Sequence, residues 1–136
     1  MKVLLDTNVV LDLLLDRAPF AEPAVKIFSM IEKSEMEAAL CATTVTTIDY
    51  LLSRSLPHSS VHKALMRLLE LFEIAPVNRS VLEEALACGM KDYEDAVLAF
   101  SANLVGASAV VTRNTRDFRD SPVKAVDPLE FISSLN

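Results

Sequence analysis

Glycine and aromatic residues are scarce in this chain of 136 residues, which has two glycines, no tryptophan and 6% aromatic residues. No G-x-G-x-x-G loop follows the first apolar segment, and this absence argues against a dinucleotide-binding enzyme. Cys41 and Cys88 lie far apart, without C-x-x-C spacing or a nearby histidine. They argue against a zinc site or a disulfide framework and are predicted to be buried thiols.

Basic charge is also scarce, since the formal net charge is −6. This balance opposes general nucleic-acid binding through a basic face. It leaves open an acidic pocket filled by divalent cations, which reverse the local charge. No apolar run reaches the roughly 18 residues that a membrane span needs. Met1 and Lys2 lead directly into an apolar strand without the pattern of a signal peptide, so we expect a cytoplasmic protein that does not enter membranes.

Alternating apolar segments are what the chain does contain, with 51% hydrophobic residues. Strands are predicted at 2–5, 36–41, 72–77, 107–112 and 123–128. Helices are predicted at 8–16, 21–34, 44–53, 59–71, 92–105 and 128–135, with another from Asn78 or Ser80 to Gly89. The connections are too long for hairpins, so the pattern predicts an α/β fold with a mostly parallel central sheet. The length predicts a single domain over residues 1–136.

Polar residues gather at the ends of these predicted elements, where ligands of parallel sheets bind. In chain order they are Asp6, Asn8, Asp92, Glu94, Asp95, Thr112, Asn114 and Asp117. Carboxylates that lie close together repel one another, and a divalent cation removes this penalty. Hard oxygen ligands suit Mg²⁺ or Mn²⁺. Such a cation can polarise a phosphodiester and activate water.

Each acidic motif also has a purely structural interpretation. Thr7 or Asn8 would cap the first helix, with Asp6 near its positive end. Asp92 would cap a later helix, with Asp95 three residues on as in a capping box. Asp117 would stabilise a turn, and Asp49 would be a solvated helix residue. Taken one at a time, these motifs do not distinguish structure from catalysis.

Four motifs in a fixed order do distinguish them. They are "LLDTNVVLDLL", "TTVTTIDYL", "DYEDAVLAFSA" and "VVTRNTRDF". With this order the chain resembles the PIN-domain family, and most closely the bacterial VapC-like toxins, over essentially its whole length. The first and last motifs are fairly specific, and the middle two are weak alone.

The resemblance implies a three-layer sandwich with helices on both sides of the sheet and an acidic, metal-dependent nuclease site. Asp6, Asp95 and Asp117 are the implied ligands of Mg²⁺ or Mn²⁺. Asp49 takes the place of the family's usual glutamate as a fourth catalytic acid, but it is one methylene shorter. The residues implied to orient substrate or ligands are Thr7, Asn8, Asp92, Thr112 and Asn114.

Arg113, Arg116 and Arg119 form the densest basic cluster of the chain. Arg113 and Arg116 are candidate contacts for RNA phosphates. The structural alternative is a solvated charged loop. The scarcity of aromatic residues fits recognition of RNA shape or of a loop.

The function implied by the resemblance is an endoribonuclease that acts as the toxin of a toxin–antitoxin pair. A small antitoxin would cover the site, and in such systems it often supplies an arginine. Such toxins commonly form homodimers, and the apolar segment 61–72 is either a dimer surface or core.

Two alternatives stay open at this point. One is a catalytically weakened PIN-like binding module, because Asp49 and Asn114 depart from the family pattern. The other is a phosphatase of the haloacid-dehalogenase kind, suggested by "DTNVV". That chemistry needs a second aspartate where this chain has Asn8, which cannot act as a general acid.

Overall fold

Five parallel strands form one central sheet in the computed structural model of the protein, which describes residues 1–135. The strands are Lys2–Leu5 (β1), Glu37–Cys41 (β2), Glu73–Ala75 (β3), Ala109–Val111 (β4) and Ala125–Val126 (β5). Their order across the sheet is β3-β2-β1-β4-β5, and every pairing is parallel. The predicted parallel α/β sheet is therefore confirmed.

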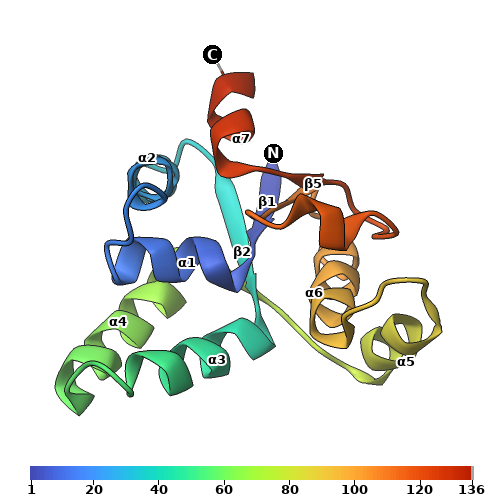
Figure 1. Cartoon of the computed structure of the whole chain (residues 1–136), viewed down its shortest axis with the longest axis horizontal. Helices are drawn as coiled ribbons and strands as arrows, with labels where there is room; N and C mark the ends of the chain where they lie inside the picture. Colours follow the sequence, from blue (N-terminus) through green and yellow to red (C-terminus); the bar gives the residue numbers. More distant parts are fainter. Residues whose placement is uncertain (136) are drawn as a thin grey trace.

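Seven α-helices surround the sheet in the described part of the chain (Figure 1). They are Thr7–Leu14 (α1), Ala21–Glu32 (α2), Ala42–Leu52 (α3), His58–Leu71 (α4), Arg79–Ala87 (α5), Tyr93–Leu104 (α6) and Pro128–Ser134 (α7). A single 3₁₀ turn, Thr115–Phe118 (η1), follows β4. None of these helices is long and apolar enough to cross a membrane.

Local chemistry accounts for several helix ends. The side chain of Asn78 accepts a hydrogen bond from Val81 N at 2.9 Å and caps α5, one of the two predicted starts. Gly106 follows α6 with φ +73°, a conformation that costs glycine little. The predicted strands at 72–77 and 123–128 were too long, since β3 has three residues and β5 two. Each is an edge strand with one neighbour, so the ladder stops early.

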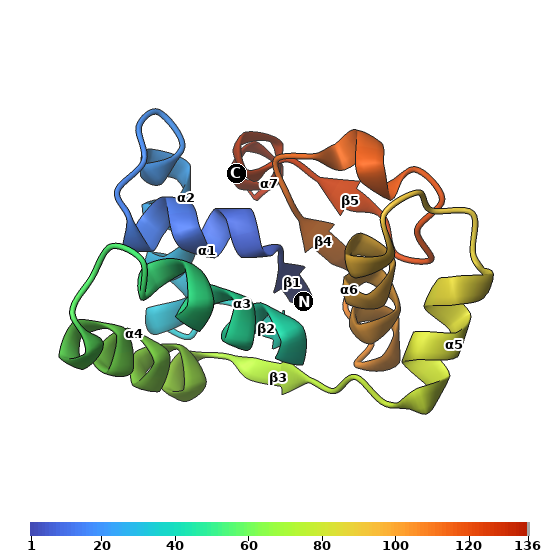
Figure 2. The ribbon, with the colours of Figure 1, turned by 60° about the horizontal axis from the view of Figure 1, so that its bottom comes forward.

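The core has two halves, one on each face of the sheet. Val3 and Leu5 of β1 point to one face and Leu4 to the other, because side chains alternate along a strand. Helices α1 to α4 and α7 cover the first face, and α5, α6 and η1 cover the second (Figure 2). Each fully buried leucine or valine contributes about 1.5–3 kcal/mol through removal from water. The predicted three-layer sandwich is confirmed.

The apolar segment 61–72 mostly serves as core. Val61, Leu68 and Phe72 are buried in the first half of the core. Met66 and Leu69 lie on the outer side of α4 and stay about half exposed. The core interpretation is right for the buried residues, and the homodimer remains a prediction.

The strand order changes direction between β1 and β4. The chain first builds β2 and β3 on one side of β1, and then adds β4 and β5 on the other. Ligands of open parallel sheets bind at the carboxyl edge of such a switch point. Asp6 N donates to Val111 O at 2.9 Å there, which joins the chain segments that leave the two strands.

Candidate acidic site

Asp6 leaves the end of β1 and lies almost fully buried, with 7% of its surface exposed. One carboxylate oxygen accepts a hydrogen bond from Thr7 N at 2.7 Å, which makes Asp6 itself the cap of α1. The expectation that Thr7 or Asn8 caps this helix was therefore wrong, and α1 begins at Thr7. The other oxygen accepts the Thr112 hydroxyl at 2.7 Å.

The pKa of Asp6 reflects a balance between burial and these donors. Burial raises the pKa above the ordinary value of an aspartate. The hydrogen bonds from Thr112 and Thr7 and the positive charge of Arg113 oppose that rise. The site thus holds a buried carboxyl group while supplying donors that favour its ionised form.

Thr7 and Asn8 extend this wall of the site. The Thr7 hydroxyl lies 3.0 Å from the Thr44 hydroxyl of α3. Asn8 Nδ2 donates to Asp6 Oδ2 at 3.4 Å. Its Oδ1 is buried without a hydrogen-bond partner among residues 1–135, which leaves one free acceptor next to Asp6.

Asp95 comes from the first turn of α6 and is partly buried. Burial raises its pKa to about 7, together with the negative charges of Asp6, Asp92, Asp117 and Glu94. These four acids come from three separate parts of the chain. Asp6, Asp92, Asp95 and Asp117 are therefore close enough to influence one another electrostatically, as their positions at element ends predicted.

Asp92 and Asp117 are the exposed members of this group. Asp92 caps α6 by accepting a hydrogen bond from Asp95 N at 2.9 Å, so the capping interpretation of this motif is correct. Asp117 belongs to η1, and its backbone N donates to Asn114 O at 3.0 Å. Asp92 thus combines a capping role with an electrostatic one, whereas no side-chain cap closes η1 at Asp117.

Thr112 and Asn114 position this corner. Thr112 is fully buried, and its hydroxyl donates to Asp6 while accepting a hydrogen bond from Asn114 N at 3.0 Å. These two hydrogen bonds join the chain segment that follows β4 to the segment that follows β1. The Asn114 side chain is exposed.

Among residues 1–135, no hydrogen bond joins the Asp49 side chain to this group. It lies exposed on α3, and it does not contribute to the raised pKa values of Asp6 and Asp95. The residue of α3 that reaches the site is the buried Thr44, through Thr7. The helix presents Thr44 and Asp49 on different sides, since residues five apart are not on one face.

Asp12 is the site neighbour that the sequence analysis missed. It is 1% exposed in α1, and it accepts hydrogen bonds from Arg113 Nε at 2.7 Å and Arg17 Nε at 3.0 Å. The Arg113 guanidinium also stacks 3.9 Å from the centre of the Phe20 ring. The signal available in the sequence was a lone acid within the apolar run "VVLDLLL". Arg113 is therefore engaged with Asp12, whereas the Arg116 side chain is exposed.

No three histidine, cysteine, aspartate or glutamate side chains in residues 1–135 form a ready metal cluster. The carboxylates do supply hard oxygen donors, and the unpartnered Asn8 Oδ1 adds a neutral one. Burial and the neighbouring negative charges raise the pKa of Asp95, and a cation would relieve both costs of its ionised form. The donor set thus fits Mg²⁺ or Mn²⁺ in its chemistry.

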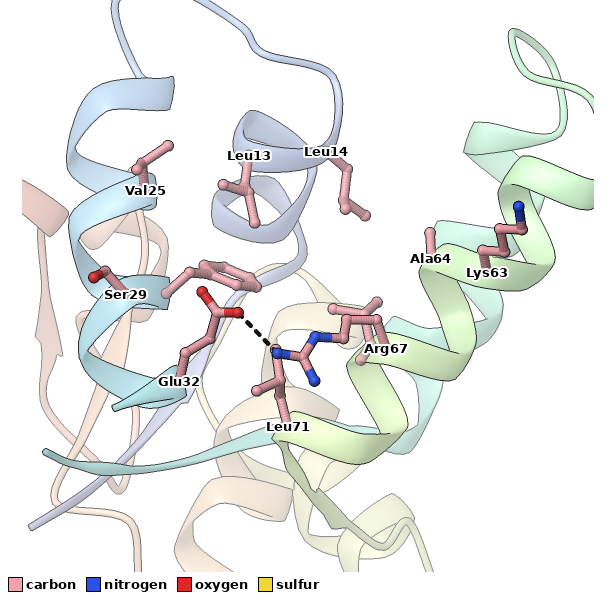
Figure 3. Close-up of a pocket in the computed structure, with 11 residues that line it drawn as sticks. Leu13, Leu14, Val25, Ser29, Glu32, Lys63, Ala64, Arg67 and Leu71 are labelled. Carbon is pink, nitrogen blue, oxygen red and sulfur yellow. Dashed lines mark hydrogen bonds and ion pairs between the residues drawn. The ribbon is translucent and has the colours of Figure 1, made fainter. Parts of the chain in front are cut away.

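A separate cleft of about 580 Å³ lies between α1, α2 and α4 (Figure 3). Leu13, Leu14 and Val25 line it, and Arg67 pairs with Glu32 at 2.8 Å at its edge. None of the predicted site residues lines this cleft. Its lining comes from α1, α2 and α4 alone, which separates it from the acidic site.

A family model described as a PIN domain matches residues 2–116. The chain belongs to the PIN-domain family. This match confirms the family suggested by the sequence motifs, and the haloacid-dehalogenase alternative is no longer needed. No curated protein matches the sequence.

Solved structures share the PIN fold along nearly the whole chain. A toxin–antitoxin complex from Klebsiella pneumoniae is 23% identical with a TM-score of 0.70, covering 93% of this chain and 97% of that one. FitAcB from Neisseria gonorrhoeae is 23% identical with a TM-score of 0.71, covering 93% and 98%. VapC20 from Mycobacterium tuberculosis, a toxin that cleaves the sarcin-ricin loop, is 14% identical with a TM-score of 0.63, covering 79% and 86%.

Proposed function

We propose that this PIN domain is an endoribonuclease that depends on Mg²⁺ or Mn²⁺ and acts as the toxin of a toxin–antitoxin pair. The observation that carries the proposal is that Asp95 lies partly buried among the negative charges of Asp6, Asp92 and Asp117, and burial together with these charges raises its pKa to about 7. Acids that meet at the switch point of a parallel sheet are costly without a cation. The cleavage activity of VapC20 supports RNA as the substrate class.

Asp6, Asp95 and Asp117 would hold the cation, with Asp92 beside them. A bound cation would polarise the phosphodiester and make a nearby water more acidic. Thr112 and Thr7 hold the Asp6 carboxylate in a fixed orientation through hydrogen bonds of 2.7 Å each. Burial of Asp6 limits competition from bulk water at this ligand.

Cleavage of RNA by the purified protein tests the proposal. We expect a labelled RNA hairpin to be cut in the presence of Mn²⁺ and left intact in EDTA. Asp95→Asn should lower the rate by about 100-fold or more, because even loss of a residue that supports a metal ligand costs roughly 10- to 100-fold.

Asp16→Asn provides the matched control. Asp16 is exposed at the end of the first helical segment with φ 50°, a conformation that asparagine tolerates. It should cleave like the wild type. Equal activity of Asp95→Asn and the wild type would refute the assignment of Asp95.

A second candidate is a PIN-like binding module without catalysis. It is favoured by the absence of a ready three-residue metal cluster in residues 1–135 and by the exposed position of Asp49. Isothermal titration with Mn²⁺ separates the two functions. Binding at micromolar to millimolar concentration fits the nuclease, and no heat at millimolar Mn²⁺ fits the module.

The antitoxin partner is part of the proposal. Its support is the similarity to the Klebsiella pneumoniae toxin–antitoxin complex and to FitAcB. Coexpression with the proposed antitoxin should yield a complex that no longer cleaves RNA. A homodimer and a cytoplasmic location belong to the same proposal.

A further inference from the structure

A polar cleft of about 450 Å³ adjoins the acidic site. One side is the α5–α6 connection with Lys91 and Asp92, and the other is η1 and the turn after it, with Asp117 and Arg119. Figures 1 and 2 show these two segments side by side next to the start of α6. A smaller cleft of about 260 Å³ lies across Arg116 and Asp117, which line both.

The basic residues of the larger cleft have no charged partner within residues 1–135. Lys91, Arg116 and Arg119 are exposed, and within residues 1–135 they make no ion pair. Arg113 and Arg17, in contrast, are both bonded to Asp12. The three free cations are therefore available to a ligand, and they lie directly beside the acidic site.

The charge of this cleft depends on the acidic site. Its carboxylates are Asp92, Asp117 and Asp120, which equal the three cations in number. When Asp92 and Asp117 face a divalent cation, only Asp120 offsets the basic residues. Asp120 packs under the α5–α6 connection, since a Cβ atom on Gly89 would lie 3.4 Å from its Oδ2. Once the acidic site holds a divalent cation, the cleft would therefore favour an anionic ligand.

The size and the lining indicate which anion fits. No aromatic ring lines the cleft, so base stacking is not what it offers. Lysine and arginine at a groove bind the phosphates of a nucleic-acid backbone. A volume of this order holds one small ligand, in the range of roughly 300–1,000 Å³. It therefore suits a nucleotide of a single strand rather than a duplex.

We propose that this cleft binds a backbone phosphate of single-stranded RNA next to the bond that is cut, through Lys91 and Arg119. Arg116 lines both this cleft and the smaller one, so it would contact the strand as it passes from one to the other. The choice of RNA rests on the proposed nuclease function. Lys91 is new to the site, since it is far in sequence from the basic cluster after β4.

Binding of RNA measured by fluorescence anisotropy tests the cleft. The probe is a fluorescein-labelled single-stranded oligoribonucleotide of mixed sequence, titrated with protein and Mn²⁺ at several salt concentrations. All proteins retain Asp95 and can hold Mn²⁺, and the probe has phosphorothioate linkages so that it is not consumed during the titration. The test variant carries Lys91→Ala and Arg119→Ala, and the control carries Lys33→Ala and Arg79→Ala. Lys33 and Arg79 are exposed and line neither cleft.

We expect the test variant to bind about tenfold more weakly and the control to change less than twofold. Loss of two phosphate contacts should also reduce the slope of log affinity against log salt by about 1.4, since each contact with a single strand contributes roughly 0.7. Equal weakening of test variant and control would overturn the proposal. An absence of RNA binding in the parent protein would also overturn it.

Cleavage of unmodified RNA by the same proteins separates this inference from the nuclease proposal. In this assay Lys91→Ala with Arg119→Ala should raise KM for RNA about tenfold and change kcat less than twofold. If the double variant cleaves RNA with an unchanged KM, the nuclease proposal stands and the proposed role of the cleft is refuted. If the wild type does not cleave RNA but its RNA binding depends on Lys91 and Arg119, the role of the cleft stands and the nuclease proposal is refuted.

Discussion

Asp6 caps a helix and lines the acidic site with the same carboxylate. Oδ1 accepts from Thr7 N, while Oδ2 accepts from the Thr112 hydroxyl. The two interactions fix the orientation of a side chain that is 7% exposed. A capping role and a catalytic role are therefore not alternatives here, although the sequence presents them as such.

Asp95 should titrate near neutral pH in the metal-free protein. Its folded pKa of about 7 lies above the ordinary 3.8, so the folded protein binds more protons than the unfolded chain between these values. Stability therefore falls as the pH rises through this window. We expect Asp95→Asn to be more stable than the wild type at pH 8 by about 1 kcal/mol, after allowance for solvent screening, with a smaller difference at pH 5.

Urea unfolding in EDTA at both pH values measures this effect. Asp16→Asn is the control and should follow the wild type at both. A difference between Asp95→Asn and the wild type that is the same at pH 5 and pH 8 would show that Asp95 does not titrate in this range.

For Asp49, in contrast to Asp95, we expect a substitution to have little effect on RNA cleavage. Its side chain is exposed on α3, and it does not take part in the raised pKa of Asp95. We expect Asp49→Asn to change the rate of Mn²⁺-dependent RNA cleavage less than twofold. A loss comparable to that of Asp95→Asn would show that α3 turns Asp49 into the site when substrate binds.

The first helix connects the acidic site with the rest of the molecule. Asp12 lies on α1, between one and two helical turns beyond Asp6. Its carboxylate accepts hydrogen bonds from both Arg17 and Arg113. Arg17 precedes α2 and Arg113 follows β4, so one buried carboxylate fastens α1 to two connections. Arg17 also donates to Asn8 O at 3.3 Å.

Asp12→Ala should destabilise the protein by about 2 kcal/mol. Removal of one partner from a buried ion pair costs roughly 3–5 kcal/mol, and the partly exposed arginines recover some hydration. Urea denaturation measures the change. Glu22→Ala, which removes an exposed pair with Lys26 at 3.9 Å, is the control and should cost less than about 0.5 kcal/mol. Equal effects of the two substitutions would contradict the buried role of Asp12.

The whole molecule carries a net charge of −6. Some of this negative charge comes from Asp6, Asp95 and Asp117, which lie at one edge of the sheet. Cation binding that relieves this repulsion should stabilise the folded state. At ten times the dissociation constant, Mn²⁺ should add about 1.4 kcal/mol and raise Tm by roughly 4 °C.

Thermal unfolding with and without Mn²⁺ measures this stabilisation. Asp95→Asn should lose most of the shift, and Asp16→Asn should keep it. A Tm that is independent of Mn²⁺ in the wild type would favour the binding module over the nuclease.

Much of the fold followed from the sequence. The alternation of elements predicted a parallel sheet, and Asn78, Asp92 and Gly106 marked helix ends correctly. The short edge strands β3 and β5 were overestimated, because edge pairing depends on the neighbouring strand and not on local apolar content. A single domain over residues 1–136 remains a prediction.

The sequence by itself determined the family and the layers of the fold, because the periodicity of each element and the order of the motifs can be read along the chain. It could not determine which residue of α3 faces the site. In the structure Thr44 of α3 contacts Thr7, and the catalytic role of Asp49 on the same helix remains a prediction. Nor could it pair Asp12 with Arg113, which is 101 residues away. Such contacts depend on how β1 and β4 lie next to each other, and only the assembled sheet places those side chains within bonding distance.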